Sequence, residues 1–163
     1  MPPQLIVFDL DFTLWDCDGT WCDCLSPPFE IRSGMVLDSR KRHITLYSDI
    51  QKILDECKFQ KWKMALASRT EQPAWAQQLI ELLGIARYFR NSEIYPSSKL
   101  EHFAALREAT KVEYQQMLFF DDEQRNITEI NSLGVCCIHV TQGLNHQLFR
   151  QGLDRFINKT ELQ

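Results

Sequence analysis

Short apolar runs alternate along the chain with stretches of helical periodicity. A short run of continuous apolar residues is typical of a strand buried on both faces of a sheet. Such runs occur at residues 5–8, 64–67, 117–120 and 135–140, and a shorter candidate lies at 93–95. The runs at 5–8 and 117–120 lead directly into acidic residues. The pattern therefore predicts a set of buried strands, two of which end in carboxylates.

Between these runs, apolar residues recur at the spacing of amphipathic helices. The expected N-caps are Ser48, Thr70 and Ser98. Glu101 follows Ser98 at capping-box spacing, and Gly84 and Gly134 are expected to end two of the helices. A final helix is expected to bury the apolar face of residues 144–157. Strands alternating with helices indicate right-handed βαβ units.

This order predicts an α/β fold: a three-layer, Rossmann-like, mostly parallel sheet with helices on both faces. Residues 30–37 and 42–47 flank a polar turn at 38–41 and predict a β-hairpin. With 163 residues, a single domain spanning 1–163 is expected. The segments between the predicted strands are too short for an additional domain, so the hairpin at about 30–47 is expected to form only a small flap.

Composition and charge argue against several classes of function. The net charge of −4 argues against a nucleic-acid surface. No apolar run reaches the ~20 residues of a membrane span. The start, Met1-Pro2-Pro3-Gln4, has no basic region of the kind that opens a signal peptide. We therefore expect a cytoplasmic protein that binds neither nucleic acid nor membrane; its oligomeric state is not predictable from these features.

Six cysteines raise the question of a metal site. Cys17, Cys22 and Cys24 share one loop, which allows a zinc site or a substrate contact. Their spacing is not that of a paired zinc motif, and no second half of such a motif follows. A zinc-binding module is therefore a minor alternative. Cys57 falls on an apolar helix face, where cysteine behaves as a small hydrophobic residue.

Polar residues of particular types follow the predicted strands. Asp9 and Asp11 follow the first strand, Ser68 the second and Asp121 a later one, while Lys99 opens a helix. If the strands are parallel neighbours, these groups converge on one edge of the sheet. Clustered carboxylates repel, by about 4 kcal/mol for two charges 4 Å apart at an effective dielectric of 20. A cation is therefore expected among them, and carboxylate oxygens with open positions favour Mg²⁺ with a phosphate.

The same residues resemble the haloacid dehalogenase (HAD) superfamily of phosphatases. Asp9-Leu10-Asp11-Phe12-Thr13 is similar to its Asp-x-Asp-x-Thr motif I. Ser68 resembles motif II, Lys99 motif III and Asp121-Asp122 motif IV. The resemblance covers residues from about 5 to 157, and it implies a HAD-like fold. Motif I directly after an apolar strand is the specific part of the match, whereas a serine and a lysine at loose spacing are weak signals alone.

The resemblance also implies roles at the reacting centre. Asp9 would be the nucleophile and a Mg²⁺ ligand. Asp11 would be the general acid/base and would bind Mg²⁺ through its backbone carbonyl. Asp121 would be a third ligand, with Asp122 orienting a metal-bound water and Thr13 holding the loop. The implied reaction is Mg²⁺-dependent hydrolysis of a phosphomonoester through an aspartyl phosphate on Asp9.

Substrate contacts are implied for three further residues. Ser68 and Arg69 would bind the phosphate, and Lys99 would hold it beside the nucleophile. Without a cap domain the mouth should be open to a phosphorylated protein, phosphotyrosine included, or to a phosphorylated small molecule such as a fructosamine 6-phosphate. Of the four tryptophans, Trp15 and Trp21 are expected near the substrate.

Two features leave alternatives open. A phospho-receiver signalling module also combines an acidic cluster, a hydroxyl residue and a lysine on a parallel sheet, without turnover. The loop 16–26 departs from the superfamily pattern, with Asp16 where a proline is usual, so substrate specificity and any contact from Asp18 stay open. The basic turn 40–43 is expected to be a solvated hairpin turn more than a substrate contact.

Overall fold

A five-stranded parallel sheet forms the centre of the computed structural model, which describes residues 1–162. Its strand order is β7-β6-β1-β8-β9, and every neighbouring pair is parallel. The strands are β1 (Leu5–Phe8), β6 (Lys63–Ser68), β7 (Asn91–Ile94), β8 (Met117–Asp121) and β9 (Cys136–His139). The central strand β1 is buried along its whole length, as its continuous apolar sequence predicts.

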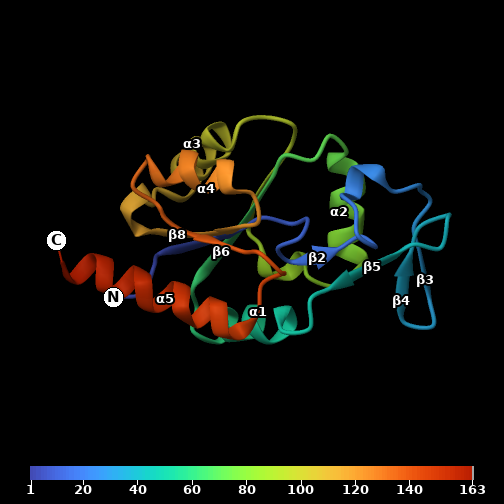
Figure 1. Ribbon diagram of the computed structural model, residues 1–163, viewed down its shortest axis with the longest axis horizontal. Helices are drawn as coiled ribbons and strands as arrows, with labels where there is room; N and C mark the ends of the chain where they lie inside the picture. Colours follow the sequence, from blue (N-terminus) through green and yellow to red (C-terminus); the bar gives the residue numbers. More distant parts are fainter. Residues whose placement is uncertain (163) are drawn as a thin grey trace.

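Helices cover both faces of this sheet. They are α1 (Ile50–Phe59), α2 (Pro73–Leu82), α3 (Lys99–Thr110), α4 (Gln124–Asn131) and α5 (His146–Glu161). In Figure 1, α3 and α4 lie on one side of the sheet and α1 and α5 on the other. Three short 3-10 helices complete the helical segments: Cys22–Cys24, Ala86–Tyr88 and Tyr114–Gln116.

The alternation of side chains along each strand divides the core into two layers. From β1, Ile6 and Phe8 point into the larger apolar cluster, while Leu5 and Val7 point into the smaller one beneath α3 and α4. Successive side chains of a strand lie on opposite faces, so a strand covered on both sides has to be apolar throughout. The predicted three-layer α/β fold is confirmed.

A second, antiparallel sheet stands beside the first and has the order β2-β5-β4-β3. Its strands are β2 (Trp15–Asp16), β3 (Glu30–Arg32), β4 (Met35–Leu37) and β5 (His43–Leu46). The hairpin predicted for residues 30–47 is confirmed in part: β4 and β5 pair around the polar turn. However, Ser33 and Gly34 both take positive φ angles, so residues 30–37 form a further tight hairpin and not one strand.

The helix starts differ in detail from the prediction. Helix α1 begins after Asp49 and α2 after Gln72, so Ser48 and Thr70 are not their N-caps. Ser98 is an N-cap, and its hydroxyl accepts a hydrogen bond from the Leu100 amide at 3.1 Å. The capping box is absent, because the Glu101 carboxylate binds the Ser97 hydroxyl. Within residues 1–162, no helix combines the length and apolar character needed to cross a membrane.

Candidate active site

Three adjacent strands deliver the predicted polar residues to one edge of the sheet. Phe8, the last residue of β1, is in register with Leu66 of β6 and Phe120 of β8. Asp9 follows Phe8, Asp121 follows Phe120, and Ser68 lies two residues beyond Leu66. The convergence expected from the sequence is therefore observed, and it is a direct result of the parallel register.

Lys99 connects two of the carboxylates. Its side chain is 1% exposed, and its Nζ atom lies 3.1 Å from Asp9 Oδ1 and 3.2 Å from Asp121 Oδ2. Nζ also donates a hydrogen bond to the backbone carbonyl of Ala67. Burial opposes the charge on this ammonium, but Asp9 and Asp121 outweigh burial and raise the pKa of Lys99. Lys99 is therefore a fixed positive charge at the centre of the site.

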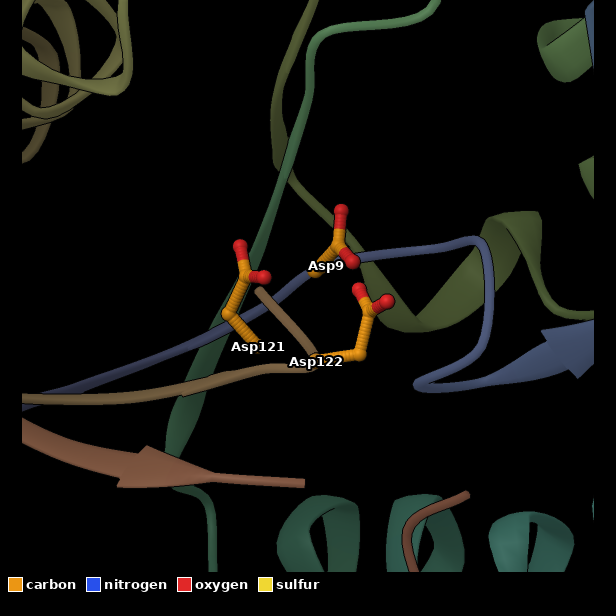
Figure 2. A group of neighbouring side chains, drawn as sticks. All are labelled: Asp9, Asp121 and Asp122. Carbon is orange, nitrogen blue, oxygen red and sulfur yellow. The ribbon is translucent and has the colours of Figure 1, made fainter. Parts of the chain in front are cut away.

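The carboxylates of Asp9, Asp121 and Asp122 form one group, because an oxygen of each lies within 4.8 Å of the others. Figure 2 shows Asp9 at the end of β1, with Asp121 and Asp122 beside it at the end of β8. Asp122 was expected to act through a metal-bound water, but its carboxylate belongs to the group itself. Thr13 donates a hydrogen bond to Asp9 Oδ2 at 3.2 Å, which holds the nucleophile candidate in place.

Burial makes this group electrostatically unfavourable without a cation. It raises the pKa of Asp9 to about 8, although Lys99 lowers it, and it raises the pKa values of Asp121 and Asp122 to about 6. One ammonium faces three carboxylates, so negative charge is left uncompensated. Three hard oxygen donors with excess negative charge match the ligands that Mg²⁺ prefers. The residues present therefore fit a magnesium ion.

Asp11 has one oxygen occupied and one free. Its Oδ1 accepts hydrogen bonds from Trp15 Nε1 at 2.7 Å, from the Cys22 amide at 3.0 Å and from the Cys17 thiol at 3.6 Å. Within residues 1–162, its Oδ2 has no hydrogen-bond partner. Burial raises the pKa of Asp11, against these three donors. A carboxyl with a raised pKa and a free oxygen is suited to carry a proton.

Two residues after β6 supply hydrogen-bond donors. Ser68 is 3% exposed, and its hydroxyl accepts from the Thr70 amide at 3.3 Å, which leaves the hydroxyl proton available. The Arg69 guanidinium is held by Asn126 Oδ1 at 3.1 Å. Asn126 in turn donates from Nδ2 to Asp121 Oδ2 at 3.1 Å. Asn126 therefore couples the arginine to the carboxylate group.

Most of the predicted site residues border one cleft of about 540 Å³, but Asp121 and Thr13 lie outside its lining. Its lining includes Asp9, Asp11, Trp21, Asp23, Ser68, Arg69, Thr70, Glu71, Pro96, Ser97, Ser98, Lys99, Asp122, Glu123, Arg125 and Asn126. Trp21 is 52% exposed and lines this cleft, and its expected place near the substrate stays a prediction. Trp15 was expected there too, but this is wrong: Trp15 is completely buried and contacts Asp11 from below.

The hairpin, the basic turn and Asp18 all lie outside the lining of the cleft. Among the residues described, none from 30–47 lines it, so the hairpin is not a flap over the site. Arg42 of the basic turn is held by the buried Asp38 at 2.9 Å, and Asp18 is exposed outside the lining. The cleft lining gives no support to the expectation that the hairpin covers the entrance; β3 and β4 instead extend the second sheet.

The cysteine loop does not assemble a metal site. Cys17 and Cys22 are buried while Cys24 is exposed, and within residues 1–162 the three thiols form no metal-ligand group. Cys17 bonds Asp11, and Cys22 lies 3.1 Å from Thr70 Oγ1. The zinc alternative has no support, and these two thiols pack the floor under Asp11.

Sequence reasoning missed Asn126. It is 2% exposed and lies in the first turn of α4, shortly after the acidic pair. The sequence contained a clue to its role. A helix that directly follows a strand ending at the site places the polar residues of its inward face beside that site. Arg125 in the same turn and Glu123, the N-cap of α4, also line the cleft and were not assigned to the site from the sequence.

Comparison with known proteins places the chain in a family. The acid phosphatase family model matches residues 1–159. The chain belongs to this family. It is 44% identical over 156 residues to human magnesium-dependent phosphatase 1, covering 94% of this chain and 87% of that protein. It is 36% identical over 146 residues to a HAD-like hydrolase superfamily protein of Schizosaccharomyces pombe, covering 82% and 83%.

A solved structure supports the same fold. The crystal structure of a HAD-superfamily hydrolase from Ehrlichia chaffeensis matches with a TM-score of 0.67 at 16% identity, covering 96% of this chain and 98% of that one. This structure supports the fold, and the HAD-like relative at 36% identity confirms the resemblance to the HAD superfamily stated from the motifs. The roles of the individual site residues stay predictions.

Proposed function

We propose that this acid phosphatase family member is a Mg²⁺-dependent phosphomonoester hydrolase that forms an aspartyl phosphate on Asp9. The observation that carries the proposal is the group of three carboxylates within 4.8 Å, two of which, Asp9 and Asp121, are bridged by the buried Lys99. The name of the human relative supports the choice of magnesium. Asp9, Asp121 and Asp122 would hold the ion through side chains, and Asp11 through its backbone carbonyl. Bound Mg²⁺ would neutralise these carboxylates and the phosphate oxygens.

In the first half of the reaction, an Asp9 carboxylate oxygen attacks phosphorus and the ester P–O bond breaks. The leaving oxygen takes the proton of Asp11, whose raised pKa and free Oδ2 suit this role. Ser68 and Arg69 donate hydrogen bonds to the phosphoryl oxygens. Lys99 keeps Asp9 oriented, since its ammonium lies 3.1 Å from Oδ1.

In the second half, ionised Asp11 accepts a proton from water, and the water oxygen attacks phosphorus. The bond between phosphorus and the Asp9 oxygen breaks, releasing inorganic phosphate and regenerating both carboxyl groups. The same residue thus donates and then accepts one proton, which balances the cycle. Thr13 holds Asp9 Oδ2 throughout by its hydrogen bond.

The proposed substrates are phosphorylated proteins, including phosphotyrosine, or phosphorylated small molecules such as a fructosamine 6-phosphate. The open cleft of about 540 Å³ supports this range, because no described residue of 30–47 covers it. Nucleic acid and membranes are not proposed as partners, in line with the net charge of −4. Six free thiols support a reducing compartment such as the cytoplasm.

The test is phosphate release from para-nitrophenyl phosphate with Mg²⁺. Activity should disappear on chelation and in Asp9→Asn, and return with added Mg²⁺ in the wild type alone. Hydrolysis that survives both changes would contradict the proposal. A panel containing a phosphotyrosine peptide and a fructosamine 6-phosphate, compared by kcat/KM, would then assign the substrate class.

The phospho-receiver alternative predicts a different result. A receiver would keep the phosphoryl group on its aspartate and show no turnover. Membership of the acid phosphatase family supports turnover. Asp11 supports it too, because a receiver that retains its phosphoryl group needs no poised proton carrier.

A further inference from the structure

A second cavity lies at the opposite edge of the parallel sheet. It has a volume of about 330 Å³, and Lys63 and Asn91, the first residues of β6 and β7, line it. Ser68, at the other end of β6, lines the carboxylate cleft. Five residue steps of strand correspond to roughly 17 Å, so the two cavities are separate sites.

Five basic side chains line this second cavity, which we call the basic cavity: Lys58, Lys61, Lys63, Arg87 and Arg90. Asp55 lies 4.0 Å from Arg87. Within residues 1–162, the other four cations have no carboxylate within 4.0 Å, and no acid lines the cavity. The net charge of the chain is −4, so the basic cavity is opposite in sign to the protein as a whole.

Local secondary structure explains the presence of only some of these five cations. Lys58 lies in the last turn of α1, where a cation is favourable beside the free carbonyls. Lys63 instead opens a strand, and Arg90 lies between a 3-10 helix and β7. Cations gathered from three separate segments around one concavity repel one another, and an anion bound among them would relieve that repulsion.

The aromatic residues of the basic cavity divide into two roles. The Tyr88 ring is covered by the Arg87 guanidinium at 4.7 Å and by the Lys58 ammonium at 5.8 Å, so it positions cations. Trp62 is half-buried in the wall, near Met64 and Ala109 in the same lining. It offers a flat apolar surface next to the charges.

We propose that the basic cavity binds a nucleoside polyphosphate, with the phosphates on the lysines and arginines and the base against Trp62. A guanidinium group can donate two parallel hydrogen bonds to two oxygens of one phosphate, and a nucleobase can stack on an indole ring. The volume agrees with the ~300–1,000 Å³ of small-ligand sites. This site goes beyond the phosphatase reaction and does not depend on it.

The first test is calorimetric titration of the intact protein with ATP in the presence of EDTA. EDTA leaves the carboxylate cleft without a metal, so the triphosphate is repelled there and is not hydrolysed. ATP should bind the wild type, more weakly as salt is added. The double variant Lys61→Glu/Arg90→Glu should lose at least about tenfold in affinity, because two charged hydrogen-bond donors to phosphate are replaced by carboxylates that repel it. Lys52→Ala, exposed on α1, is the matched control and should bind as the wild type does.

The second test separates a nucleotide from a bare phosphate chain. ATP should bind more tightly than tripolyphosphate, and Trp62→Leu should remove that preference. Para-nitrophenyl phosphatase activity should be unchanged in every variant. Absence of ATP binding, equal affinity for ATP and tripolyphosphate, or unchanged affinity in Lys61→Glu/Arg90→Glu would each overturn the proposal. The last comparison uses exposed residues, so it decides even if Trp62→Leu fails to fold.

Discussion

The ammonium of Lys99 lies 3.1 Å from Asp9 Oδ1, although 90 positions separate the two residues in the sequence. Both side chains are almost fully buried. The pair forms because β1 and β6 are parallel neighbours and α3 returns to the same sheet edge. The ion pair therefore depends on the fold, and the fold in turn tolerates the buried carboxylates because this cation is present.

Replacing Lys99 by methionine should destabilise the protein in the absence of Mg²⁺. Removing one partner of a buried ion pair costs about 3 kcal/mol or more, because Asp9 and Asp121 are left uncompensated. Urea unfolding at neutral pH with EDTA measures this loss. Lys111→Met, exposed and paired with Glu108, should change stability by less than about 1 kcal/mol. Equal losses in the two variants would contradict the assigned role of Lys99.

Asn126→Ala should weaken both Mg²⁺ and substrate binding. The amide bridges Arg69 and Asp121 at 3.1 Å on each side, so its loss frees both. Loss of a residue that orients a metal ligand lowers metal affinity by about 10–100-fold. Mg²⁺ titration and KM measure the two effects. Asn131→Ala, exposed on the same helix, should change neither, and an unchanged Mg²⁺ affinity in Asn126→Ala would refute the coupling.

Trp15→Phe should move the alkaline limb of the kcat/KM profile to higher pH. Burial raises the pKa of Asp11, and the Trp15 N–H opposes this by bonding Oδ1 at 2.7 Å. Without that donor the pKa rises further, so Asp11 stays protonated to a higher pH. Trp75→Phe, which removes a ring packed on Phe29, serves as the control. A limb that stays in place or moves to lower pH would show that Asp11 is not the proton donor.

His102 should make the protein less stable in mild acid. Burial, followed by the nearby Lys99 charge, lowers the pKa of His102 to about 4 from 6.5. Below pH 6.5 the unfolded chain binds a proton at His102 that the folded protein refuses, so the contribution of His102 to stability falls as pH drops toward 4, while the raised pKa values of Asp9, Asp121 and Asp122 act in the opposite direction. The His102 contribution amounts to roughly 3 kcal/mol. Urea unfolding at pH 6.5 and pH 4 should therefore show that His102→Gln gains stability relative to the wild type as pH falls, with the exposed His43→Gln as the control.

The sequence was sufficient to predict those elements that are determined by hydrophobic periodicity and by the residues at the ends of buried strands. Buried runs such as Leu5–Phe8 are recognisable because both faces of the strand are apolar. The convergence of Asp9, Ser68 and Asp121 follows once the strands are taken as parallel neighbours. These inferences need only local pattern and one topological rule.

Other features depend on tertiary contacts that no local pattern encodes. Trp15 flanks motif I in the sequence, but it turns inward to bond Asp11 and is not at the entrance. Helices α1 and α2 begin later than the predicted N-caps Ser48 and Thr70. Near these starts, Asp49 accepts a hydrogen bond from the distant His146 amide and Thr70 accepts one from the Gln72 amide. Asn126 connects the nearby Asp121 to Arg69, which is 57 positions away in the sequence, so its bridging role appears only in three dimensions.

The most direct test of the central claim is chemical trapping of the phosphorylated enzyme. Borohydride added during turnover of para-nitrophenyl phosphate reduces an aspartyl phosphate to homoserine, which mass spectrometry of the digested protein can locate. The mechanism predicts homoserine at position 9, dependent on Mg²⁺ and on substrate. Phosphate release that continues while position 9 stays unreduced, or reduction at a different aspartate, would contradict it.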